Sequence, residues 1–183
     1  MADCTLSLGL DDSCGALIGG VARVLVANWS DITTVVATTD TIDAVTMATT
    51  TQFYELGSLP TGVIAATAVG TGERKGVQQA VPLVTQGDDA VIKAFYDKII
   101  NGAKVAVLIG LPNGDWKMYG RRPDAAEGGA GNPLKHVGNG DGNTTGAGQD
   151  DFAGYNYVVE ERQVDHPWFV DPTIIDALLI AAV

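Results

Sequence analysis

The sequence has few of the residues that carry most enzyme and nucleic-acid chemistry. Its 183 residues include two histidines, two cysteines and 11 basic residues against 22 acidic ones, for a formal net charge of −11. Wrapping nucleic acid requires Lys and Arg to displace phosphate counterions, so this charge balance argues against it. Aromatic residues make up only 7%, and there are 23 glycines. Together with many alanines and valines, this composition favours short strands and tight turns over a helical bundle.

The sequence also lacks a long hydrophobic run. The segment Ile174–Val183 is interrupted by Asp176 and is shorter than the about 20 apolar residues that span a bilayer. Met1-Ala2-Asp3 carries no basic region of the signal-peptide kind. Cys4 and Cys14 have the spacing of neither a zinc knuckle nor a redox pair. We therefore expect a soluble protein with free thiols, made in a cytoplasm as a single domain over residues 1–183.

The most informative stretch, Asp88–Arg122, indicates a short helix followed directly by a β-hairpin. Asp88 or Asp89 can cap a helix over about residues 88–101, and Gly102 supplies a left-handed stop. The residues expected to cover a sheet share one helical face; they are Val91, Ile92, Phe95, Ile99 and Ile100.

The hairpin follows from an apolar run, a turn and a second short strand. Residues 103–109 have strand length, and Pro112-Asn113-Gly114-Asp115 predicts a turn before a strand at 116–119. Trp116 and Met118 share one face of that strand. Arg121-Arg122 is interpreted as a charge pair at the strand end and not as an anion site.

Alternating and β-branched patterns predict a mainly β (α+β) fold. It is an antiparallel β-sandwich or rolled β-barrel with one flanking helix, a long Gly-rich loop and extended termini. Pro82 favours an edge position or a bulge. The other predicted strands are 21–27, 34–38, 42–48, 51–56, 63–71 and 76–85. The predicted regions are an N-terminal arm (1–18), a β-core with helix and hairpin (19–122), a long Gly/Asp/Asn loop (123–151), a final core strand (152–164) and a C-terminal arm (165–183). The loop has too few large apolar residues to fill a core. In the C-terminal arm, Thr173 is predicted to cap a short apolar tail.

The motifs that suggest chemistry are weak. Gly128-Gly129-Ala130-Gly131 is not followed by the Gly-Lys-Ser/Thr of a phosphate loop. A calcium loop starting at Asn139 would need Gly where Thr144 stands and Glu where Asp150 stands. The remaining candidates lack a local catalytic context: His136 in the loop, His166 before Pro167, Ser7, Ser13, Ser30 and Ser58, and Glu160 and Glu161 on opposite strand faces. We therefore predict no catalytic, cofactor-binding or metal-binding residues.

Four stretches occur in an order that points to a family. They are Gly19–Asp31, Ile42–Ala48 with Phe53-Tyr54-Glu55, Asn101–Gly120, and Asp150–Tyr157. In this order the chain resembles tail-tube, or virion structural, proteins of tailed bacteriophages, over most of Gly19–Glu161. The resemblance implies a β-sandwich or rolled sheet with one flanking helix, and subunits that stack as rings, commonly hexameric, into a hollow tube.

The expected function is therefore that of a non-enzymatic virion subunit of the tail tube, made in the host cytoplasm. Its expected partners are copies of itself, other tail or virion proteins, and genomic DNA passing through the lumen without specific binding, with no membrane insertion. The long loop and the termini would interlock neighbouring subunits. Two alternatives stay open: a capsid decoration, cement or other head protein, and a small calcium-dependent binding module or hydrolase. Acidic residues expected to line the channel include Asp40, Asp43, Glu55, Asp115, Glu160 and Glu161.

Overall fold

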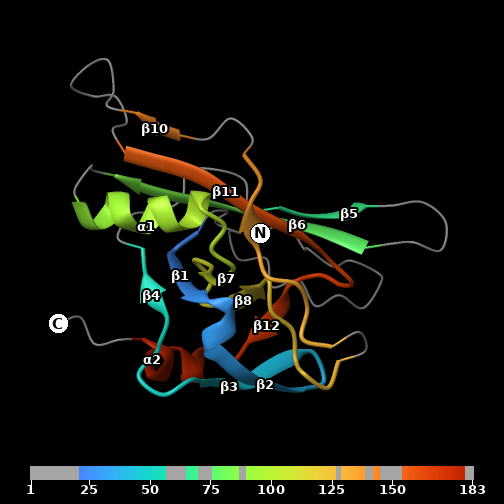
Figure 1. Cartoon of the computed structure of the whole chain (residues 1–183). Coiled ribbons are helices and arrows are strands. Elements are labelled where there is room, and N and C mark those ends of the chain that lie inside the picture. Colours follow the sequence, from blue (N-terminus) through green and yellow to red (C-terminus); the bar gives the residue numbers. More distant parts are fainter. Residues whose placement is uncertain are drawn as a thin grey trace, which may run out of the picture.

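The computed structural model describes residues 21–56, 65–69, 76–86, 90–126, 129–138, 142–144 and 154–179. These residues form two β-sheets, one main helix and a short C-terminal helix (Figure 1). The predicted fold class, a mainly β sandwich with one flanking helix, is confirmed. The predicted N-terminal arm lies outside the described residues.

The larger sheet has seven strands in the order β2-β3-β12-β8-β7-β1-β4. Neighbours in this sheet are antiparallel, except that β12 pairs with β3 in parallel. The predicted hairpin is confirmed, and Gly114 adopts a φ of +92° in its turn. The bounds are β1 Arg23–Asn28, β2 Ile32–Thr38, β3 Thr41–Met47, β4 Tyr54–Glu55, β7 Val105–Gly110, β8 Trp116–Tyr119 and β12 Trp168–Val170, with a 3-10 turn, η1, at Trp29–Asp31.

The smaller sheet has the order β10-β11-β6-β5, and β9 also pairs with β11. Pro82 lies in β6 opposite Val158 of β11. On the other side of β6, β5 pairs only with residues 76–80. Among the described residues Pro82 therefore has a strand partner on one side alone, as its missing N–H requires. The bounds are β5 Ala65–Val69, β6 Gly76–Gln86, β9 Lys135–His136, β10 Gly142–Thr144 and β11 Gly154–Gln163.

Helix α1 (Ala90–Ile100) covers the core between the two sheets at one side of the sandwich (Figure 1). Its predicted stop is confirmed: Gly102 has a φ of +92°, and the Ala103 N–H donates to the Lys98 carbonyl at 3.0 Å. The proposed cap residues, Asp88 and Asp89, lie outside the described residues.

The predicted contact face of α1 is partly wrong. Val91 is 79% exposed and Ile100 is 44% exposed, whereas Tyr96 is buried. The residues that pack on the core follow the i, i+3, i+4, i+7 rule and are Ile92, Phe95, Tyr96 and Ile99. The predicted face contained only aliphatic residues and Phe, whereas Tyr96 lies in the middle of the stripe.

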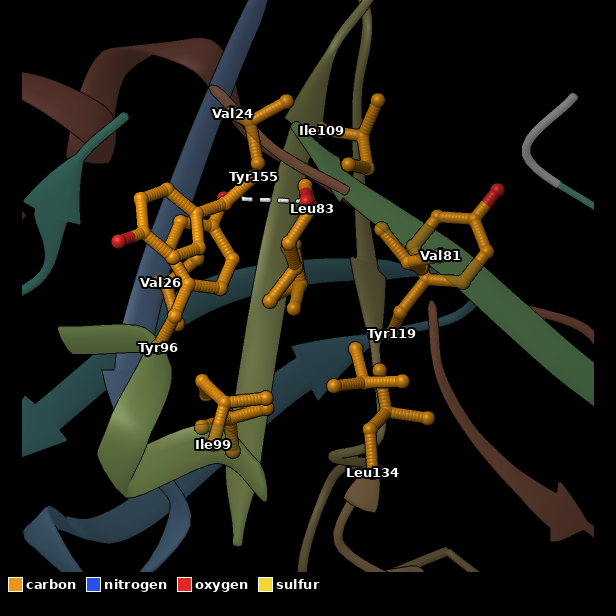
Figure 2. Close-up of a cluster of buried hydrophobic side chains, with 13 residues drawn as sticks. Val24, Val26, Val81, Leu83, Tyr96, Ile99, Ile109, Tyr119, Leu134 and Tyr155 are labelled. Atoms are coloured by element: carbon orange, nitrogen blue, oxygen red, sulfur yellow. Dashed lines mark hydrogen bonds between the residues drawn. The ribbon is translucent and has the colours of Figure 1, made fainter. Parts of the chain in front are cut away.

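Tyr96 belongs to the core between the sheets (Figure 2). Its ring stacks on Tyr155 with centroids 4.9 Å apart, and its hydroxyl donates to the Leu83 carbonyl at 3.0 Å. Burial raises the pKa of Tyr96 to about 12. The phenol is therefore a neutral hydrogen-bond donor that ties the helix to β6.

A second core covers the opposite face of the seven-stranded sheet, and the C-terminal segment builds it. The predicted C-terminal arm is wrong over Trp168–Leu178, because β12 inserts between β3 and β8, and Val170, Ile175 and Leu178 are buried. The 3-10 turn η2 (Pro172–Ile174) leads into α2 (Ile175–Leu178).

Asp171, and not the predicted Thr173, caps this turn. The Asp171 carboxylate accepts hydrogen bonds from the backbone N–H and the hydroxyl of Thr173, at 2.9 and 2.7 Å. These two bonds lower the pKa of the Asp171 carboxyl. A carboxylate satisfies an orphan N–H at a helix start more strongly than a hydroxyl does, which explains why the acid takes the position.

The predicted loop over residues 123–151 also contributes to the core, contrary to expectation. Leu134 is fully buried, and its N–H and C=O both bond to Val105 at 2.9 Å. Strands β9 and β10 from the same segment pair with β11. An isolated leucine in a polar stretch gives no periodic signal, which is why the burial of Leu134 was not predicted from the sequence.

Two adjacent isoleucines test the revised orientation of α1. Ile99→Ala should lower the free energy of unfolding by about 2–5 kcal/mol, because it leaves a cavity between the sheets. Ile100→Ala is the matched control and should cost less than about 1 kcal/mol, because Ile100 is half exposed. Urea denaturation followed by circular dichroism measures both. Equal costs would contradict this helix orientation.

Candidate assembly surface

The sequence candidates for catalysis do not come together. His136 lies in β9, where its Nδ1 is 3.2 Å from the Val158 carbonyl oxygen, and His166 is exposed between β11 and β12. Ser30, the one serine in the described ranges, contacts Asp31. Those same ranges contain no group of three or more His, Cys, Asp or Glu side chains placed to hold a metal ion.

The Gly-rich turn at residues 129–131 presents backbone carbonyl oxygens, which accept hydrogen bonds, where a phosphate site would need N–H donors. The carbonyl oxygens of Gly129 and Ala130 accept hydrogen bonds from the guanidinium groups of Arg122 and Arg121. A phosphate loop points N–H groups at its ligand, so this turn has the opposite polarity. In the region of the calcium candidate, residues 142–144 form β10 and pair with β11, which is extended backbone and not a ligand loop. Asn139 and Asp150 lie outside the described residues.

Arg121 and Arg122, the two arginines after β8, are buried. The sequence indicated a charge pair at the strand end and did not predict this burial. Each side chain is about 5% exposed or less and meets a carboxylate. Arg121 pairs with Asp124 at 2.8 Å and lies over the Trp29 ring at 4.9 Å. Arg122 donates to the Asp165 carboxylate from Nε at 3.1 Å and from Nη2 at 2.9 Å.

Asp165 joins segments that are distant in sequence. Its carboxylate also accepts from Trp168 Nε1 at 2.9 Å, and its carbonyl accepts from the Gln79 amide at 3.2 Å. The Gln79 side-chain oxygen in turn accepts from the Gly120 N–H at 3.0 Å. We call Arg122, Asp165, Trp168 and Gln79 the polar clasp. It ties β6, the end of β8 and the start of β12 into one unit.

A groove with a volume of about 570 Å³ lies between α1, β1 and β4. Its described walls are apolar apart from Asn28, Lys98 and the Tyr54 hydroxyl. No carboxylate lines these walls, so the groove offers contact area and a single cation, without an acid–base pair. The groove is therefore better suited to apolar contact with another surface than to acid–base catalysis.

Three edge strands carry no charged residue and no proline. They are β2 (Ile-Thr-Thr-Val-Val-Ala-Thr), β5 (Ala-Ala-Thr-Ala-Val) and β10 (Gly-Asn-Thr). Among the described residues, the charged edge strands are β9, which carries Lys135 and lies beside β10 on β11, and β4, whose Glu55 forms a two-bond ion pair with Arg23 at 2.7 and 2.9 Å. On β2, the Asp124 carboxylate accepts from the Val35 N–H at 2.8 Å and protects one point of the edge.

The six acids expected to line a channel come from both sheets. Asp40, Asp43, Glu55 and Asp115 belong to the strands and turns of the seven-stranded sheet, whereas Glu160 and Glu161 belong to β11 in the other sheet. Glu161 pairs with Lys135 at 2.7 Å. Burial raises the pKa of Glu161, but hydrogen bonds from Lys135 and from the Arg162 N–H outweigh it and leave a lowered pKa.

Comparisons with protein families, with curated proteins and with solved structures found no match for this chain. Among the described residues, no helix has the length and apolar character needed to cross a membrane. Any inference of function therefore starts from the chain's own surfaces.

Removing the carboxylate of the polar clasp tests its structural role. Asp165→Ala should lower the free energy of unfolding by about 3–5 kcal/mol, because it removes the carboxylate that compensates the charge of the buried Arg122 guanidinium. Asp176→Ala, at an exposed position in α2, should cost less than about 1 kcal/mol. Thermal unfolding of both variants gives the comparison, and similar melting temperatures would show that the clasp adds little stability.

The Arg23–Glu55 pair predicts a dependence of stability on pH. Hydrogen bonding from Arg23 lowers the pKa of the Glu55 carboxyl below its ordinary value of 4.5. The stabilisation is therefore fully present above about pH 4.5 and disappears as the pH falls through the folded-state pKa. Glu55→Gln should lower the melting temperature near neutral pH and have no effect in strong acid. An unchanged difference at both pH values would exclude an ionic contribution.

Proposed function

We propose that this chain is a bacteriophage virion structural protein, a tail-tube subunit whose copies assemble into stacked rings around a channel for DNA. The proposal begins with the resemblance in segment order. The fold that the resemblance implies, a sandwich with one flanking helix followed by a hairpin, is the fold of this chain.

The uncharged sheet edges carry the proposal. An edge strand presents unpaired N–H and C=O groups, and monomeric β-proteins protect such edges with lysine, proline or covering segments. Strands β2 and β5 have neither charges nor proline. Asp124 covers β2 at Val35, through its carboxylate and its backbone N–H. The rest of these two edges is suited to pair with a strand of a neighbouring subunit. Copies that pair edge to edge form extended sheets, which is what a ring requires.

The charge balance is compatible with a passage for DNA. With 22 acidic and 11 basic residues, the chain has too few cations to hold phosphates by counterion release. A channel wall with excess negative charge would repel the duplex and leave it mobile. This argument supports conduction and does not depend on which acids face the lumen.

Lysine substitutions at two edges test edge-to-edge assembly. The wild-type protein should form rings or rods in negative-stain images and large species in sedimentation velocity. The double variant Thr33→Lys/Thr67→Lys places a charge on β2 and on β5 and should remain small, because an edge lysine opposes strand pairing. Thr49→Lys, in the exposed turn after β3, is the matched control and should assemble like the wild type.

Three results would contradict the tail-tube proposal. A wild-type protein that stays monomeric at every concentration would exclude self-assembly. Small closed oligomers without rods would favour a capsid decoration protein. A large rise in melting temperature with added calcium, which ligand binding to the folded state produces, would favour a calcium-dependent module.

A further inference from the structure

Strand β4 has a strand partner on one side only among the described residues. It is the last strand of the seven-stranded sheet, where it pairs with β1. Directly before β4, Phe53 forms a parallel bridge with Leu179, and the Phe53 N–H donates to the Leu178 carbonyl at 2.8 Å. Figure 1 shows β4 between α2 and α1. The C-terminal segment therefore meets the chain just before β4 and runs in the same direction.

The backbone of β4 directs its next hydrogen-bonding groups to the side on which Phe53 is paired. The Leu56 N–H donates to the Val24 carbonyl of β1 at 3.0 Å. Because successive residues of a strand direct their N–H and C=O groups to opposite sides, Glu55 directs both groups away from β1, as Phe53 does. Glu55 is therefore the next position at which a chain beside Phe53 can pair.

The sequence continues from Leu179, the last described residue, as Ile180-Ala181-Ala182-Val183. We propose that Ile180–Val183 continue the parallel bridge along β4 and form an eighth strand of the sheet. Four residues of extended chain span about 13 Å, which exceeds the length of the two-residue β4. The segment follows Leu179 directly, so it reaches the edge without a connecting loop.

The register of the bridge places Ile180 beside the apolar groove. Val26 of β1 pairs with Tyr54 of β4, and residues paired in this way share one side of the sheet. Val26 is buried, whereas Tyr54 is 53% exposed and lines the groove between α1, β1 and β4. Because Leu179 pairs with Phe53, Ile180 comes next to Tyr54 and extends this row. An isoleucine there covers a groove whose described walls are largely apolar.

The same register brings a small residue to the charged position of β4. Ala181 comes next to Glu55, which forms the two-bond ion pair with Arg23. An alanine at this point leaves room for the ion pair. The segment Ile180–Val183 contains neither glycine nor proline and carries no charged side chain, as suits a strand that joins an apolar sheet.

The proposed strand removes β4 from the edges that can receive a neighbouring subunit. A strand that is paired on both sides no longer presents open N–H and C=O groups. Neighbouring copies then meet the seven-stranded sheet at β2, its opposite end. The inference does not depend on the proposed self-assembly, and its failure would leave the tail-tube proposal standing.

Proline substitutions at two adjacent alanines test the proposed strand. In the parallel register the Ala182 N–H points to the Glu55 carbonyl, whereas the Ala181 N–H points away from β4. Ala182→Pro should therefore disrupt the pairing. Ala181→Pro is the matched control, because an edge strand tolerates proline where the N–H faces outward. Hydrogen–deuterium exchange of the Glu55 amide in dilute protein measures the pairing, and the Leu56 amide, which is bonded to Val24, is the internal reference.

The expected result is a loss of protection in one variant alone. The Glu55 amide should exchange at least about tenfold more slowly in the wild-type chain than in Ala182→Pro, because it donates to the Ile180 carbonyl only while the strand is formed. Ala181→Pro should keep the wild-type protection. The Leu56 amide should exchange at a similar rate in all three chains.

The other results overturn the proposed strand. Fast exchange of the Glu55 amide in the wild type would show that no chain pairs with this position. Equal protection in the wild type and both variants would assign the protection to another part of the molecule. Equal loss in both proline variants would contradict the parallel register, and protection that appears only as the protein concentration rises would assign the edge to a neighbouring copy.

Discussion

Strand β7 is buried on both faces, and this constraint determines the layers of the protein. Val105, Val107 and Ile109 point toward α1 and the smaller sheet, whereas Ala106 and Leu108 point toward the C-terminal segment. Each large apolar side chain that leaves water contributes about 1.5–3 kcal/mol, so neither face can stay uncovered without a large loss of stability. The chain meets this need with two separate cores on one shared sheet.

The features predicted from sequence depend on residues close together in the chain. Gly102 and Gly114 mark a helix end and a turn through their own backbone preferences, and both have the positive φ that those positions require. The features that were missed depend on distant partners. Arg122 is buried because Asp165, 43 residues away, neutralises it, and Leu134 is buried because Val105 binds its backbone. A local sequence pattern does not predict contacts between residues so far apart in the chain.

The candidate assembly surface shows the same division. The absence of charge in Ile32–Thr38 is visible in the sequence and predicts a strand. The position of this strand at the end of the sheet is not visible in the sequence, because it depends on β12, which lies between β3 and β8 and pairs with β3 in parallel. Likewise, alternation along β3 indicates that Ile42 and Thr41 point to opposite sides, but only the arrangement of both sheets determines which side is covered.

The insertion of β12 also has a consequence for biosynthesis. Ribosomes deliver β2 and β3 early, but these strands join β8 only through β12, which is the last strand to be made. Until then the nascent chain holds two separate pieces of one sheet, and the polar clasp, which ties β6, the end of β8 and the start of β12, lacks Asp165 and Trp168. Parallel pairing over such sequence separations is slow. The seven-stranded sheet is therefore complete only after translation has passed these residues, and until then the apolar faces of its two pieces lack part of their cover.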